Sequence, residues 1–194
     1  MIFIKQTKFN IALLMSIMLI GCNSQTQKKE IKFDHVSLKV LGTIQDGGIP
    51  HLGCNKKCCE EYFLNQTQRI GVSSLGISNL KNNKNYLIDA TPDINFQLKK
   101  LIGNENISNK LNGIFITHAH MGHYSGLLNL GRESFSSSLV PLFVMPKMYE
   151  FISSNGPWDQ LVKLKNIDLK SLSNNKPEVL EDNLSIVPFL VPHR

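Results

Sequence analysis

The sequence predicts a mixed α/β (α+β) domain, because short apolar runs of strand character alternate with a segment of helical periodicity. Residues 36–40 alternate apolar and polar side chains, as in a strand with one buried face. Residues 94–102 place apolar side chains at i, i+4, i+7 and i+8, which is one face of a helix. The 194 residues, 42% of them hydrophobic, suffice for one globular domain with a core. Strands and helices in this order build an αββα sandwich.

The first 21 residues have the features of a bacterial signal peptide. Lys5 and Lys8 form a basic region before an apolar run over residues 11–20, which is shorter than the roughly 20 residues that a spanning helix needs. The run ends in Leu19-Ile-Gly-Cys22, which resembles a lipobox and implies cleavage before Cys22 and lipidation of its thiol. An ordinary secretory signal and an uncleaved anchor are the alternatives.

The segment after the lipobox is polar and predicts a flexible tether over residues 22–35. The domain over residues 36–194 is therefore expected to hang from a bacterial membrane on the exported side, periplasmic or outer-surface. The formal charge of +6 falls to +4 once Lys5 and Lys8 are removed. The other lysines are scattered without an aromatic or Arg-rich stripe, so a small-molecule substrate and the membrane are expected partners and nucleic acid is not.

A glycine-rich turn follows the first strand and carries Asp46 in Asp46-Gly-Gly-Ile-Pro50. Glycines allow backbone turns that a Cβ would obstruct. Loops of this kind present functional groups on a rigid scaffold, so Asp46 is a candidate catalytic residue.

A cysteine-rich segment follows that turn, with His51, Cys54, Cys58 and Cys59 inside nine residues. This set could form a closed Cys₃His zinc site of structural type. The spacing departs from the usual Cys-x₂-Cys knuckle, and the adjacent Cys58 and Cys59 do not easily reach one metal. In an oxidising compartment a disulfide that includes Cys54 is the alternative, and free thiols are a third.

The middle of the chain predicts two strands, over residues 71–78 and 85–90, joined by the polar turn 81–84. The helix over residues 94–102 follows and is expected to end at Gly103. Further expected elements are a short helix over 124–131, a strand over 141–145, a helix over 146–155 and an edge strand over 184–191 that contains Pro188.

Three histidines, His118, His120 and His123, follow the apolar run over residues 113–117, which predicts a short buried strand. Imidazoles at i, i+2 and i+5 on a strand-exit loop can converge on one small volume. Imidazole nitrogen suits zinc, so the loop is a candidate metal site. The alternative is three surface histidines without a common function.

Residues 117–127, Thr-His-Ala-His-Met-Gly-His-Tyr-Ser-Gly-Leu, resemble the signature loop of the metallo-β-lactamase-fold hydrolases. The pattern in that family is His-x-His-x-Asp-His followed by Gly-Leu, and Gly122 stands here in place of the Asp. The resemblance implies an αββα sandwich of which this chain holds the N-terminal portion. It also implies that Asp89 orients the metal loop without binding metal; a helix-capping role for Asp89 is the alternative.

The resemblance further implies that His118, His120 and His193 hold one zinc ion. Three protein ligands leave a position open for a water whose pKa would fall to about 7, giving hydroxide at neutral pH. His123 would bind a weaker second metal or form hydrogen bonds with the ligands of the first. Asp46 could replace the missing carboxylate, although the sequence gives no geometric reason for it.

The turn at Asp46 with its downstream cysteines resembles the branch that includes the pyrroloquinoline quinone (PQQ) biosynthesis protein B, from residue 36 to the last residue. In the family, a second half supplies a bridging Asp and a final His, so we interpret the chain as a fragment or truncated product. The implied function is a membrane-anchored metal-dependent hydrolase for an ester or phosphodiester, linked to PQQ biosynthesis or transport. The alternative is a catalytically silent metal-binding or carrier lipoprotein.

Overall fold

The structure is a computed structural model that describes residues 35–64 and 70–192. The signal segment, Cys22, the tether up to residue 34 and His193 lie outside the described residues. Within those two ranges, no helix is long and apolar enough to cross a membrane.

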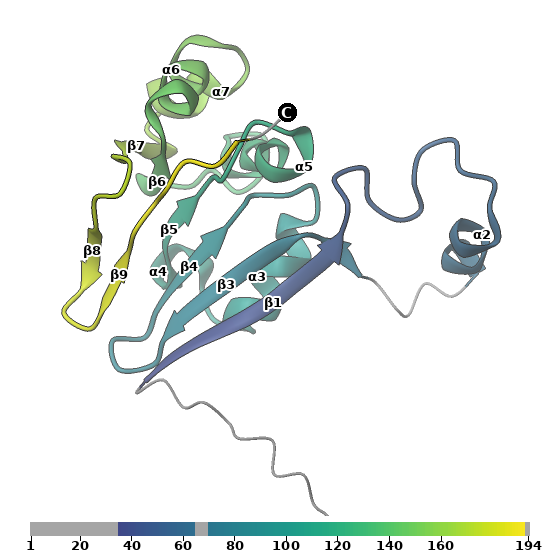
Figure 1. Cartoon of the computed structure of the whole chain (residues 1–194), viewed down its shortest axis with the longest axis horizontal. Coiled ribbons are helices and arrows are strands. Elements are labelled where there is room, and N and C mark those ends of the chain that lie inside the picture. The colour runs from purple at the N-terminus through teal and green to yellow at the C-terminus, as the bar shows by residue number, and fades with distance from the viewer. Residues whose placement is uncertain (1–34, 65–69, 193–194) are drawn as a thin grey trace, which may run out of the picture. The chain divides into compact units, whose positions relative to one another are not determined.

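A seven-stranded mixed sheet forms the centre of the described structure (Figure 1). Its spatial order is β2-β1-β3-β4-β5-β6-β7. The strands are β1 (Val36–Ile44), β2 (Gly71–Val72), β3 (Ser74–Asn79), β4 (Lys84–Ile88), β5 (Leu111–Phe115), β6 (Val140–Val144) and β7 (Ile167–Ser171). Strand β3 is antiparallel to both β1 and β4, whereas β4 to β7 are parallel. Strand β1 therefore runs in the same direction as β4 and β5, and all three end at the same edge.

Helices cover one face of this sheet (Figure 1). They are α3 (Ile94–Ile102), α4 (Ile107–Lys110), α5 (Met121–Tyr124), the 3₁₀ helix η1 (Ser125–Leu130), α6 (Pro146–Ser154) and α7 (Trp158–Lys163), while α2 (Lys57–Leu64) belongs to the arm that follows β1. Strand residues such as Leu87, Ile114 and Leu142 point toward the helices and are fully buried. Burial of apolar area at about 25 cal/mol per Å² makes this cluster the main source of stability.

The opposite face carries the neighbouring residues Tyr86, Phe115 and Phe143, because side chains alternate across a strand. The rings of Phe115 and Phe143 stack with centroids 4.5 Å apart. A two-stranded hairpin, β8 (Glu178–Glu181) and β9 (Leu184–Ile186), packs against this second cluster. The described residues thus form a helical layer, a large sheet and a small sheet, in agreement with the predicted α/β class.

Most predicted elements are present, with shifted ends. The helix over 94–102 is confirmed and ends at Gly103, whose φ of 75° is the left-handed conformation that glycine tolerates. The predicted helix over 124–131 instead begins at Met121 as α5 and continues as η1, so His123 lies inside a helical turn.

One prediction about a strand was wrong, and a second strand ends earlier than predicted. The apolar face of β1 is not buried, since Leu38 is 63% and Val40 56% exposed. The hairpin packs on the cluster around Phe115, and no element of the described ranges covers this part of β1. The strand predicted over 184–191 stops at Ile186, because Pro188 lacks an amide hydrogen and β9 pairs with β8 alone among the described strands.

Candidate metal site at the strand ends

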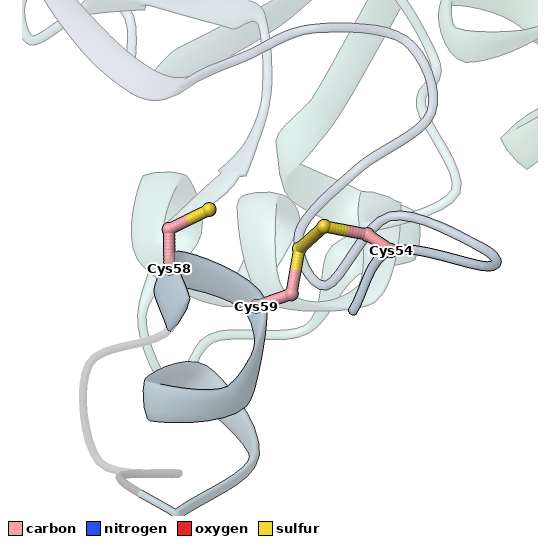
Figure 2. Close-up of side chains that lie close together, drawn as sticks. All are labelled: Cys54, Cys58 and Cys59. Carbon is pink, nitrogen blue, oxygen red and sulfur yellow. A yellow bond between two sulfur atoms is a disulfide. The ribbon is translucent and has the colours of Figure 1, made fainter. Parts of the chain in front are cut away.

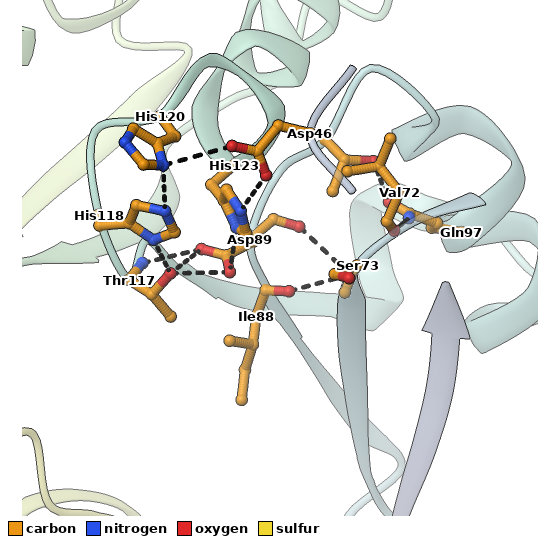
Figure 3. A network of polar contacts seen from close by, with 12 residues as sticks. Asp46, Val72, Ser73, Ile88, Asp89, Gln97, Thr117, His118, His120 and His123 are labelled. Atoms are coloured by element: carbon orange, nitrogen blue, oxygen red, sulfur yellow. Dashed lines mark hydrogen bonds and ion pairs between the residues drawn. The ribbon is translucent and has the colours of Figure 1, made fainter. Parts of the chain in front are cut away.

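Three loops leave the sheet at the edge where β1, β4 and β5 end (Figure 1). Figure 3 shows the side chains of Asp46, Asp89 and the histidines that these loops carry. Asp46 comes two residues after β1, Asp89 directly after β4, and the histidine loop (residues 117–123) shortly after β5. In open sheets, ligands bind outside the carboxyl ends of the strands, because the loops from several strands converge there. The fold therefore brings Asp46 and Asp89 to the histidines.

Asp89 fixes the histidine loop through hydrogen bonds to both ends of the loop. Its carboxylate accepts hydrogen bonds from the backbone amide of Thr117 at 2.8 Å, from the Thr117 hydroxyl at 2.8 Å and from Nδ1 of His123 at 2.8 Å. Its side chain is only 8% exposed, and its φ of 68° is unusual for a residue with a Cβ. In this geometry Asp89 orients the loop and has its oxygen atoms occupied.

His123 lies between two carboxylates. Its Nδ1 is 2.8 Å from Asp89 Oδ2, and its Nε2 is 2.8 Å from Asp46 Oδ1. Each ring nitrogen therefore faces a carboxylate, and His123 is not in the group of converging ligand atoms described next. The structure thus places His123 beside the candidate ligands instead of among them.

The candidate ligand group consists of Asp46, His118 and His120. One ligand atom from each lies within 4.8 Å of the others. His118 Nε2 is 3.1 Å from His120 Nδ1, which is 3.3 Å from Asp46 Oδ2. Nδ1 of His118 is 2.9 Å from the Thr117 hydroxyl, which directs its Nε2 toward the group. Two imidazoles and a carboxylate form a donor set that suits zinc.

A hollow of about 400 Å³ borders the two residues that orient the histidine loop, Asp89 and Thr117, and none of the three candidate ligands lines it. Thr43, Asp89 and Thr117 contribute to its wall, together with apolar side chains of β1, β3 and β4. Its volume falls in the range of small-molecule sites.

The cysteine cluster (Cys54, Cys58 and Cys59) is a separate group. Cys54 and Cys59 form a disulfide, and Cys58 is an exposed free thiol (Figure 2). The three sulfur atoms are close enough for a metal site, but His51 is not in that group. A Cβ on Gly47 would lie 2.5 Å from the His51 ring, so this ring packs on the turn beside Asp46. A zinc site here would require reduction of the disulfide.

Sequence reasoning named Asp46 without a reason for its position, and the reason is strand direction. The contact from Asp46 to His123 joins residues 77 positions apart. The pairing of β3 with both β1 and β4 aligns the ends of β1 and β4, and no local sequence pattern records this pairing.

Comparisons with known proteins agree with this fold. Residues 84–194, more than half of the chain, match the family model "Beta-lactamase superfamily domain". Zn(2+)-bound PqqB from Methylobacterium extorquens aligns at 21% identity and a TM-score of 0.67, over 80% of this chain and 52% of that one. A new diphosphatase from the PhnP family aligns at 23% identity and 0.54, over 75% and 53%.

This chain spans about half the length of those two solved structures. No curated protein sequence matches it significantly. The similarities confirm the fold that the histidine motif predicted.

Proposed function

Because the chain belongs to the β-lactamase superfamily, we propose that it is a metal-dependent hydrolase whose metal site lies at the strand ends. The observation that carries the proposal is the convergence of Asp46, His118 and His120 within 4.8 Å. Two imidazoles and a carboxylate at this spacing form a donor set that suits zinc. His193 is proposed as a further ligand from its place in the sequence alone.

Each residue of the site has a defined task in this proposal. His118 and His120 bind the ion through the ring nitrogens that face the group, and Thr117 fixes the orientation of His118. Asp89 and His123 hold the loop and the Asp46 carboxylate in place. When bound, a zinc ion supplies Lewis-acid chemistry and lowers the pKa of a coordinated water to about 7.

The proposed substrate is a small ester or phosphodiester. The hollow beside Thr117 has the volume of a small-molecule site, and the structural likeness to a diphosphatase supports a substrate that is cleaved at phosphorus. The likeness to PqqB supports a place near PQQ biosynthesis or transport. The lipobox ending at Cys22 supports an exported membrane lipoprotein.

A second candidate function is a metal-binding or carrier lipoprotein without catalysis. It is favoured by the number of ligand groups, since the described residues of this edge contain one group, formed by Asp46, His118 and His120. With this one group of ligands, the chain would bind and carry a single metal ion and would lack the second ion of a two-metal hydrolase.

Zinc content and hydrolysis measured on the full chain distinguish the two functions. We expect the His118→Ala variant to contain about one zinc ion per chain less than the His35→Ala variant. His35→Ala is the matched control, because it removes a histidine at the opposite end of β1. Both variants keep the cysteine cluster, so zinc bound there does not affect the difference. Hydrolysis of bis(p-nitrophenyl) phosphate or p-nitrophenyl acetate should fall with the zinc. Zinc loss without any hydrolysis by the parent chain supports the carrier function, and equal zinc in both variants refutes the metal site.

A further inference from the structure

We propose that Asp46 and Gly122 act as a coupled pair, in which the loop after β1 supplies the carboxylate that the histidine motif lacks. The motif His118-Ala-His-Met-Gly-His123 contains no acidic residue. This inference rests on the proposed function, because it concerns the same metal site.

The first observation is the way in which the Asp46 carboxylate is held. One oxygen, Oδ2, is 3.3 Å from Nδ1 of His120, and the other, Oδ1, is 2.8 Å from Nε2 of His123. His123 is in turn held by Asp89. The carboxylate is thus fixed on one side and faces the ligand group on the other, an arrangement that orients a metal ligand.

The second observation is the close packing of the Asp46 backbone on α5. A Cβ at Gly122 would lie 2.5 Å from Asp46 Cα, 2.7 Å from its Cβ and 3.0 Å from its carbonyl oxygen. Two of these are backbone atoms, which cannot turn aside as the end of a flexible side chain can. Any side chain at position 122 would therefore push Asp46 away from His120 and His123.

Together, the two observations mean that residues 46 and 122 cannot both place a carboxylate at the metal site. A carboxylate reaches this corner either from residue 46, with glycine at 122, or from residue 122, with the loop after β1 displaced. Two neutral imidazoles leave the charge of a dication unbalanced, and a carboxylate ligand offsets part of that charge. Asp89 is committed to Thr117 and His123, and Asp46 is the carboxylate that remains in the described ligand group.

Variants of the full chain test the coupling by zinc affinity, measured by competition with a chromophoric chelator. We expect Asp46→Asn, which keeps shape and removes charge, to weaken zinc binding about 10–100-fold. Gly122→Ala, which adds no charge, should weaken it to a similar extent because it displaces Asp46. Asp168→Asn, a half-exposed carboxylate on β7, is the matched control and should leave affinity unchanged.

The exchange itself is tested by Asp46→Gly combined with Gly122→Asp. We expect this double variant to bind zinc at least about tenfold more tightly than Asp46→Gly alone, and Co²⁺ absorption spectra should report a restored carboxylate ligand. Circular dichroism checks that each variant is folded. Zinc affinity equal to that of the wild type in Asp46→Asn or in Gly122→Ala would overturn the coupling of these two residues. The proposed metal site would still be supported if zinc binding depended on His118. If zinc binding by the parent chain did not depend on His118, both the proposed function and this inference would be overturned.

Discussion

His123 connects the ends of three strands through one imidazole ring. Its own loop follows β5, while its two carboxylate partners follow β1 and β4. The side chain is 11% exposed, so solvent weakens these contacts less than it would at the surface. Charge-assisted hydrogen bonds are stronger than neutral ones, and the pair of contacts therefore fixes the histidine loop relative to both neighbouring loops.

Asp89→Asn tests that connection at its buried end. The new amide brings donors toward the Thr117 amide and His123 Nδ1, which themselves donate, so at least one buried contact is lost. We expect zinc affinity to fall about 10–100-fold and the free energy of unfolding to fall by about 1–3 kcal/mol. Chelator competition and urea unfolding measure the two effects, with Asp168→Asn as the control. Unchanged zinc affinity would show that Asp89 does not orient the loop.

At the scale of the element, one glutamate joins the β8–β9 hairpin to residues 82–86 through three side-chain contacts. Glu181 in β8 accepts hydrogen bonds from Lys84 Nζ at 2.6 Å, from the Tyr86 hydroxyl at 2.8 Å and from Asn82 Nδ2 at 2.9 Å. Burial alone would raise the pKa of Glu181, but these bonds outweigh it and hold that pKa below the ordinary 4.5. Burial, together with Glu181, raises the pKa of Tyr86, which keeps its hydroxyl a donor.

Glu181→Gln should loosen the hairpin in a pH-dependent way. A lowered pKa in the folded state adds stability above the ordinary value near 4.5, and that stability is lost as the pH falls through the lowered pKa. We expect the variant to be about 1 kcal/mol less stable at pH 7, since solvent screens the ion pair with Lys84. The difference should shrink below pH 4. Thermal unfolding across this pH range checks it, with Glu178→Gln on the same strand as control; a constant difference contradicts it.

At the scale of the whole molecule, local patterns predicted the strands from β1 to β6 and helix α3 but not β7 or β8. The strands that end directly before Asp89 and shortly before His118 were predictable because each is an apolar run with a sharp polar boundary. The exposure of Leu38 and Val40 was not, because periodicity records which side chains share a face and not whether another layer covers it. The contact from Asp46 to His123 depends on strand order, which no local pattern contains.

The cysteine cluster relates the fold to the compartment in which the chain resides. A disulfide between Cys54 and Cys59 is stable in an oxidising compartment, whereas cytosolic thiols stay reduced. The reduced sulfur atoms are close enough to hold a metal ion with Cys58. Export through the N-terminal segment would therefore decide between the two forms of the same cluster.

Expression with and without residues 2–21 tests that dependence in the bacterial cell. We expect the full chain to be in the membrane fraction, labelled by a fatty-acid probe at Cys22, with Cys58 alone of the cluster open to alkylation. The shortened chain should stay in the cytosol with all three thiols reduced and protected until a chelator removes zinc. Differential alkylation with mass spectrometry reads both states, and Cys22→Ser is the control that should lose the lipid label but keep the disulfide. A lipid label on Cys22→Ser, or the same thiol pattern in both compartments, would contradict the assignment.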